Sequence, residues 1–334
     1  ICLSCPDSLW KALDKKAADI DFSTVSGIDD KSEPALYERI SLPSPSQEEM
    51  IIPFDAVPTI CTDLLNRLVS RGWQPMRNCP NWVARLRELA ADEVRDDPRQ
   101  SHVFELRCDS SRGEHHFSIP SSVRRIAERA YERLSTQQQE AFDDLVHGYQ
   151  KRGWWIARTE EELQQLSRST RILPPSVVFM IPGTNRRRDR LVVDLRRANR
   201  SFTRGSSSSV TVSICIAAAR LYGAAAMWVM DCSRAFYKLR WVGLLALLVV
   251  RSKLFTSDRC VFGVTTGPGS LGHTLGELIA VFRTLCTVAL LYFLLLCFVD
   301  DILCAGLDGA RAVCWLIYTL QRCAFGVSLK KFQA

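Results

Sequence analysis

The sequence predicts an α+β fold in which an antiparallel sheet is backed by helices. Three observations support this prediction. Two adjacent acids between apolar runs, in Cys297-Phe298-Val299-Asp300-Asp301-Ile302-Leu303, indicate a tight hairpin. Two β-rich runs, 177–181 and 191–195, flank a polar, basic turn and indicate a second hairpin. Between the two hairpins, apolar residues from Leu271 to Leu285 recur at helical spacing.

The composition is that of a chain with a sizeable core, because 47% of its residues are hydrophobic. Several of the 13 cysteines lie inside apolar runs, which indicates reduced thiols and an intracellular protein, cytoplasmic or nuclear. The apolar run at 285–299 is shorter than the roughly 18–20 residues that span a membrane. We therefore expect no membrane partner.

Charge is distributed unevenly along the chain. Residues 1–150 contain 18 Lys and Arg against 25 Asp and Glu, a net charge of −7. Residues 151–334 contain 25 against 11, a net charge of +14. A strongly basic half predicts a polyanionic partner such as a nucleic acid.

The pattern changes near residue 120. Prolines interrupt the segment 1–60, which reads as linker, whereas 61–75 and 81–95 predict short helices. From residue 121 onward, helices are predicted after Ser121 or Ser122, after Ser135 and after Thr159, where Thr159 and Glu162 form a capping box. We therefore divide the chain into an unassigned, partly linker-like region, 1–120, and a second region, 121–334.

The second region continues with alternating strands and helices. A strand is predicted over 221–230, ending at Asp231, and another over 244–250. Gly267-Pro268-Gly269 then predicts a turn into the helix that starts near Leu271, and the last predicted helix covers 309–324.

The adjacent carboxylates of Asp300 and Asp301 repel each other, and a divalent cation removes that penalty because Mg²⁺ binds carboxylate oxygens. A charged, solvated turn is the alternative interpretation. Asp231 at the end of a separate strand favours the metal, since two-metal phosphoryl transfer needs carboxylates from separate strands. The basic hairpin upstream can hold a triphosphate.

Five segments follow one another from about residue 160 onward, namely Arg190-Leu191-Val192-Val193-Asp194-Leu195-Arg196-Arg197-Ala198-Asn199, Asp231-Cys232-Ser233-Arg234-Ala235-Phe236-Tyr237, Gly267-Pro268-Gly269, Phe298-Val299-Asp300-Asp301 and 320–333. In this order they resemble the fingers motif and motifs A to D of the reverse transcriptases of retroelements. The LTR or tyrosine-recombinase elements are the nearer match.

The resemblance implies a palm-and-fingers polymerase core, with an antiparallel palm sheet backed by helices, that ends after motif D and lacks a thumb. It implies an RNA-directed DNA polymerase, which transfers a nucleotide from a dNTP to a primer 3′-hydroxyl. The expected partners are an RNA or DNA template with its primer, dNTPs, and the downstream thumb and RNase H part of the same polyprotein.

The resemblance also implies roles for single residues. Asp231, Asp300 and Asp301 would be catalytic and would ligate two Mg²⁺ ions, with Mn²⁺ as the alternative metal. Phe236 would be the steric gate that excludes a ribose 2′-hydroxyl. The remaining substrate-binding residues would be Arg190 at the triphosphate, Gly269 near the nascent base pair, and Lys330 or Lys331 at the leaving pyrophosphate.

The nucleic-acid contacts are expected from Arg186, Arg187, Arg188 and Arg196, although the run 186–188 also reads as a solvated turn. For Asp194 we expect a structural pair with a neighbouring arginine.

Two further functions stay open. One is a catalytically inactive, nucleic-acid-binding remnant, which the missing Pro-Gln or Pro-Phe of motif B favours. The other is an RNA-dependent RNA polymerase, against which Phe236 and Phe298-Val299-Asp300-Asp301 favour the DNA-synthesising branch.

Overall fold

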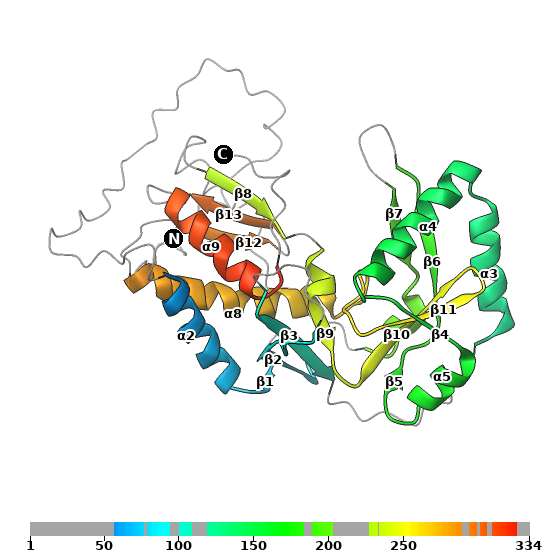
Figure 1. Ribbon diagram of the computed structural model, residues 1–334, viewed down its shortest axis with the longest axis horizontal. Helices are drawn as coiled ribbons and strands as arrows, with labels where there is room; N and C mark the ends of the chain where they lie inside the picture. The colour runs from blue at the N-terminus through cyan, green and yellow to red at the C-terminus, as the bar shows by residue number, and fades with distance from the viewer. Residues whose placement is uncertain are drawn as a thin grey trace, which may run out of the picture.

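The computed structural model has two lobes and describes residues 57–76, 79–93, 100–108, 119–183, 189–202, 227–232, 234–288, 294–298, 301–305 and 309–325 (Figure 1). These residues form a mixed α+β structure with three sheets, as the sequence predicts. The same residues include no helix that is both long and apolar enough to cross a membrane.

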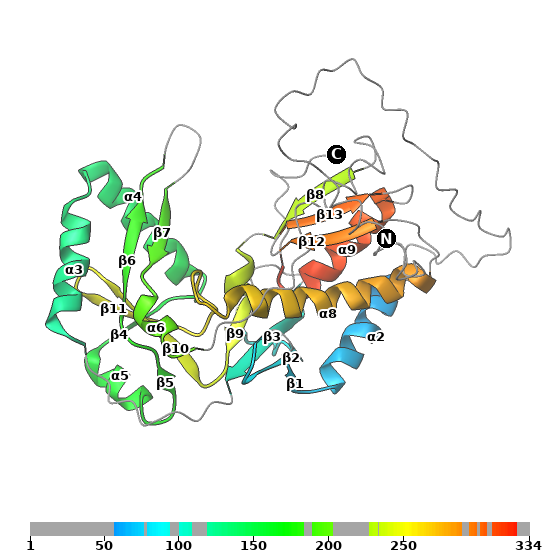
Figure 2. The ribbon, with the colours of Figure 1, turned by 180° about the vertical axis from the view of Figure 1, so that it is seen from behind.

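The smallest sheet has the strand order β12–β13–β8, and its strands are β8 (Met227–Asp231), β12 (Leu294–Phe298) and β13 (Asp301–Ala305). Both pairings are antiparallel. The strand predicted to end at Asp231 and the hairpin predicted around the paired acids are therefore confirmed in the described residues. Helices α8 (Gly267–Val288) and α9 (Gly309–Arg322) pack against each other, and α9 contacts β8 and β13 (Figure 2).

The largest sheet lies in the other lobe, and its six strands are β4 (Ile156–Arg158), β5 (Arg171–Ile172), β6 (Ser176–Ile181), β7 (Arg190–Val193), β10 (Leu244–Val250) and β11 (Lys253–Ser257). Strands β6 and β7 form the predicted antiparallel hairpin. The lobe also contains the helices α3 (Ser121–Glu132), α4 (Thr136–Lys151) and α5 (Glu160–Leu166). The predicted capping box of Thr159 and Glu162 starts α5.

The third sheet is built from β1 (Gln74–Pro75), β2 (Trp82–Glu88), β3 (His102–Cys108) and β9 (Leu239–Trp241). The prediction of a helix over 81–95 is wrong, because β2 occupies this stretch. Trp82, Ala84 and Leu86 are each 3% exposed, whereas the residues between them are half-exposed. This alternation has the period of a strand.

Helix α2 (Val57–Ser70) begins the described chain and packs on α8. One buried cluster contains Leu65 of α2, Phe104 of β3, Phe142 of α4 and Leu275 of α8. The described residues before 109 therefore share a core with those after 118.

The predicted helix after residue 267 is confirmed as α8, but it begins at Gly267 itself, so Gly267-Pro268-Gly269 is its first turn. A proline fits there because the first helical N–H groups have no partner within the helix. Leu271, Leu275 and Leu278 are fully buried, as predicted. Thr274 is buried too, and its hydroxyl donates to the Ser270 carbonyl at 3.0 Å.

Candidate functional site

The structure places Asp231, the last residue of β8, directly opposite Asp301, the first residue of β13. Directly opposed residues of an antiparallel pair have Cα atoms about 4.5–5.5 Å apart and share one face of the sheet. Two predicted carboxylate positions that are distant in the chain, one before α8 and one after it, are therefore neighbours in space.

The two faces of this sheet differ in burial. Met230, Ile302 and Cys304 alternate with the acid positions and are fully buried, on the face that the helices cover. Asp231 and Leu303, on the other face, are half-buried. The period of two along each strand thus puts apolar side chains in the core and the acid positions on the more open face.

Asp300 is the third predicted metal ligand and lies outside the described residues, between Phe298 of β12 and Asp301 of β13. Within the described ranges, no three His, Cys, Asp or Glu side chains gather as a metal site would need. The described donor set is therefore the pair of positions 231 and 301, and carboxylate oxygen is the donor that Mg²⁺ prefers.

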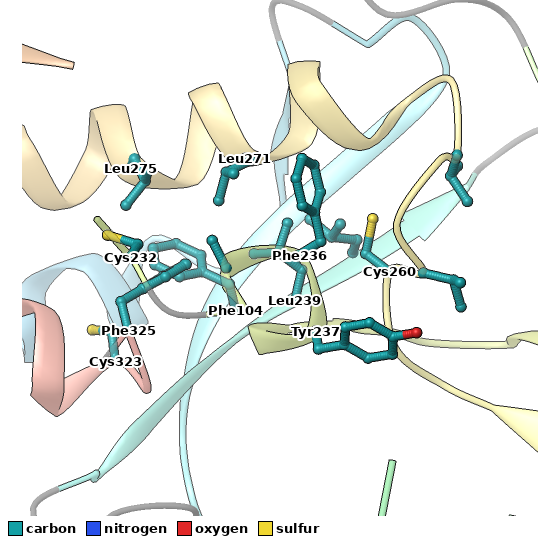
Figure 3. Packing of buried hydrophobic residues seen from close by; sticks show 14 of the residues in the cluster. Phe104, Cys232, Phe236, Tyr237, Leu239, Cys260, Leu271, Leu275, Cys323 and Phe325 are labelled. Atoms are coloured by element: carbon teal, nitrogen blue, oxygen red, sulfur yellow. The ribbon is translucent and has the colours of Figure 1, made fainter. Parts of the chain in front are cut away.

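Phe236 lies in the short 3-10 helix η4 (Ala235–Lys238), and its ring is directed toward the start of α8 (Figure 3). A Cβ atom added at Gly267 would lie 3.1 Å from Phe236 Cε1. The ring also meets Phe262 edge-on, with 5.4 Å between centroids. Phe262 is 65% exposed and covers Phe236, which is 9% exposed. The segments that resemble motifs A and B thus meet at this aromatic side chain.

The sequence singled out Gly269 for close approach, and Gly269 is buried in the first turn of α8. Gly267 is the glycine that makes room for Phe236. The sequence contained a signal for this position, since both glycines flank Pro268, but it did not indicate which one faces the ring.

Two cysteines near this site, Cys260 and Cys304, are buried thiols. Burial raises the pKa of the Cys260 thiol, beneath Gly267, to about 12. Burial also raises the pKa of the Cys304 thiol, on β13, to about 12. Both groups stay protonated at neutral pH and are therefore poor nucleophiles.

Arg190 is exposed at the start of β7, opposite Ile181. It belongs to the lobe with the six-stranded sheet. Arg186, Arg187 and Arg188, which come between β6 and β7 in the sequence, lie outside the described residues. Lys330 and Lys331 also lie outside them.

Arg196 forms two hydrogen bonds with Asp194, from Nε at 2.9 Å and from Nη2 at 2.7 Å. The structural pair expected for Asp194 is therefore confirmed. This bond from Arg196 lowers the pKa of the Asp194 carboxyl. Arg196 is the first residue of α6 (Arg196–Asn199) and its side chain is 86% exposed, so a phosphate contact there would compete with Asp194.

Asn199, the last residue of α6, is a positioning residue that the sequence did not single out. Its amide nitrogen donates to the Gly263 carbonyl at 3.0 Å, and its amide oxygen accepts from the Thr265 N–H at 3.0 Å. These two bonds hold the loop that carries Phe262 and leads into α8. The sequence signal for this role is that Asn199 ends the segment 190–199, which resembles the fingers motif.

A scan against protein-family models matched none, and a search of curated proteins found no significant match. The functional assignment therefore depends on the residues themselves and on where the structure places them.

Proposed function

We propose that this chain is the palm-and-fingers core of an RNA-directed DNA polymerase of a retroelement. The observation that carries the proposal is the register of β8 and β13, which sets Asp231 opposite Asp301 on the more open face of a helix-backed sheet. The placement of Phe236 against the start of α8 supports it further, because three separated sequence motifs then converge on one region.

Asp231 and Asp301 would hold Mg²⁺, together with Asp300 from the connection between β12 and β13. When bound, two such ions stabilise the attacking and the leaving oxygen of an in-line displacement at phosphorus. The protein supplies the position of the carboxylates, which the pairing of two strands fixes more rigidly than a loop would. The reaction joins the primer 3′-oxygen to the α-phosphorus of a dNTP and releases pyrophosphate.

Phe236 would select the sugar. Its ring is held between Gly267 and Phe262, and Asn199 ties down the loop of Phe262. A ring that is fixed on two sides can exclude a 2′-hydroxyl by contact, whereas a mobile ring would yield.

The test is primer extension on an RNA template with Mg²⁺ and dNTPs, comparing the unchanged chain with Asp231→Asn and Asp301→Asn. We expect each substitution to lower the extension rate at least about a hundredfold, as the loss of one transition-state contact does. The matched control is Asp144→Asn, an exposed aspartate on α4 that changes charge equally. Thermal melting of each variant checks the fold.

A second measurement addresses the sugar. Phe236→Val should raise the rate with rNTPs relative to dNTPs by about tenfold, because the pocket loses its contact with the 2′ position.

Extension by Asp231→Asn at the unchanged rate would rule out the metal site. Metal-independent nucleic-acid binding without any extension would instead favour the inactive remnant.

A further inference from the structure

We propose that Arg152, Arg234 and Lys238 form a phosphate-binding site around Trp154. Arg152 caps the C-terminal end of α4, Arg234 directly precedes η4, and Lys238 is the last residue of η4. The site lies where the segment after α4 meets η4, because Trp154 stacks on Tyr237 of η4. It does not depend on the proposed function, because phosphate binding requires neither a metal nor turnover.

The three cations converge on one indole ring. The guanidinium carbons of Arg152 and Arg234 lie 5.6 and 5.8 Å from the Trp154 ring centroid, and Lys238 Nζ lies 5.3 Å from it. Because all three distances share one origin, the positive charges lie within one small region, although two separate elements, α4 and η4, supply them.

The ring beneath the cations is fixed. Trp154 is 2% exposed and stacks on Tyr237, with centroids 5.0 Å apart and an interplanar angle of 12°. Tyr149 packs edge-on against it at 5.8 Å. Burial raises the pKa of the Tyr149 hydroxyl, so the aromatic group stays neutral. A rigid aromatic surface of this kind limits the conformational entropy that the side chains lose when a ligand binds.

The two arginines of the cluster are not balanced by carboxylates of the described residues. Within the described ranges, neither Arg152 nor Arg234 forms an ion pair, and Arg152 Nη1 donates to the Gly148 carbonyl at 2.6 Å. A guanidinium has five donors, so most donors of both arginines remain for another acceptor. Phosphate offers several acceptor oxygens and negative charge at once, which is the ligand chemistry that arginines match best.

The backbone of Arg234 adds a second, independent observation. Its φ of +54° and ψ of 38° lie in the left-handed region, which is uncommon for residues other than glycine and often occurs at functional sites. Arg234 follows Asp231 by three residues, so their Cα atoms are at most about 11 Å apart. A nucleotide or strand bound at the candidate acid pair could therefore extend to a phosphate site at Arg234. The source of the phosphate is either a nucleotide triphosphate or the backbone of a bound strand.

The test is binding in EDTA, which removes any contribution of metal at Asp231. One probe is a fluorescent single-stranded oligonucleotide, whose affinity is measured by anisotropy over a range of NaCl concentrations. The other probe is inorganic tripolyphosphate, followed through the midpoint of thermal unfolding. The variants are Arg234→Ala and Arg152→Gln, and the matched control is Arg125→Ala, an exposed arginine on α3.

We expect Arg234→Ala to weaken binding of at least one probe about tenfold at low salt, as the loss of a charged hydrogen bond does. If a strand is the source, the slope of log Kd against log salt falls by roughly 0.7 for each lost contact. Loss of the oligonucleotide response alone assigns the site to a strand, and loss of the tripolyphosphate response alone assigns it to a nucleotide. Equal binding of both probes by Arg234→Ala and Arg125→Ala overturns the proposal. The assay contains no metal and requires no turnover, so its outcome is separate from a failure of catalysis.

Discussion

Two tryptophans of this protein, Trp73 and Trp154, are each surrounded by cations, but the charges around them are balanced differently. Arg85 and Arg107 both contact the Trp73 ring, with guanidinium carbons 4.5 and 4.7 Å from its centroid. Arg85 is also paired with Glu105, at 2.6 Å from Nη2. Around Trp154, Arg152 and Arg234 have no carboxylate partner among the described residues.

The network beside Trp73 extends across three strands and a loop. Glu105 of β3 accepts from Arg87 of β2 at 2.8 Å, and Arg87 reaches Glu93 at 2.7 Å. Arg240 of β9 joins the network through Glu93 and through Asp258, the latter at 2.7 Å. The carboxylates join strands that are far apart in the sequence.

The electrostatic energies explain why the cluster at Trp154 differs from the network at Trp73. At an effective dielectric constant of 20, two unit charges about 11 Å apart repel by about 1.5 kcal/mol, and three such pairs by about 4.5 kcal/mol. A cation over an aromatic ring gains about 0.5–1 kcal/mol at an exposed site. The repulsion is therefore at least of the same order as the attraction. Balanced cations stabilise the fold, whereas unbalanced cations are available to a ligand.

The largest predicted effect on this comparison is the loss of stability in Glu105→Gln. The Glu105 side chain is 6% exposed and serves two arginines, so the amide would leave both partly unpaired. We expect the free energy of unfolding to fall by about 2–4 kcal/mol, measured by urea denaturation.

The control for Glu105 is Glu277→Gln, at the exposed pair with Arg71, where the effect should stay below about 1 kcal/mol. Equal losses in the two variants would contradict the structural role of the network.

The second effect concerns pH. His102 of β3 is 1% exposed, and burial lowers its pKa to about 4 from the ordinary 6.5. As pH falls, the unfolded chain takes up this proton first, so stability is complete above pH 6.5 and is lost progressively toward pH 4. We expect about 1–2 kcal/mol of this loss between pH 7 and 5, measured as the urea midpoint at each pH.

The matched control variant is His147→Gln, which removes an exposed imidazole on α4 and none from the core. His102→Gln should flatten the pH profile between pH 6.5 and 4. A profile unchanged in His102→Gln would assign the pH dependence to another group.

The smallest predicted effect concerns the backbone conformation of two arginines. Arg234 and Arg251 both have a left-handed φ, of +54° and +56°. Arg234→Gly should raise the free energy of unfolding by about 0.5 kcal/mol, because glycine adopts this conformation without a steric penalty. Arg251→Gly should give no gain, since Arg251 also lies 4.0 Å from the Tyr131 ring centroid and 3.6 Å from Asp143. Thermal melting in low-salt buffer measures both.

The parts of the fold that local patterns specify could be predicted from the sequence. The capping box of Thr159 and Glu162, the buried leucines of α8 and the hairpin of β6 and β7 are local features, and all were found. Strand β2 was mistaken for a helix because Trp82, Val83, Leu86 and Leu89 also fit a helical period. The pairing of β2 with β3 stabilises the strand, so the period of two applies to this stretch.

The candidate site was predictable to the extent that its motifs are contiguous. Asp231 and Asp301 could each be singled out, but their direct opposition depends on a register set by distant strands. The Trp154 cluster could not be foreseen, because Arg152 and Arg234 are far apart in the sequence and only the packing of α4 beside η4 brings them together. Asn199 was visible only as part of a motif, without its hydrogen-bond partners.

The parallel pairing of β3 with β9 has a consequence for biosynthesis. Phe104 pairs with Leu239, which the ribosome adds long after β3 has been made. At about 5–20 residues per second, synthesis of the chain between these two positions takes roughly 7–27 s. During that interval the edge of the β2–β3 hairpin, with the buried Leu106 among its residues, is open to strands of other nascent chains. Until β9 has been made, the edge of β3 therefore lacks the strand that covers it in the folded protein.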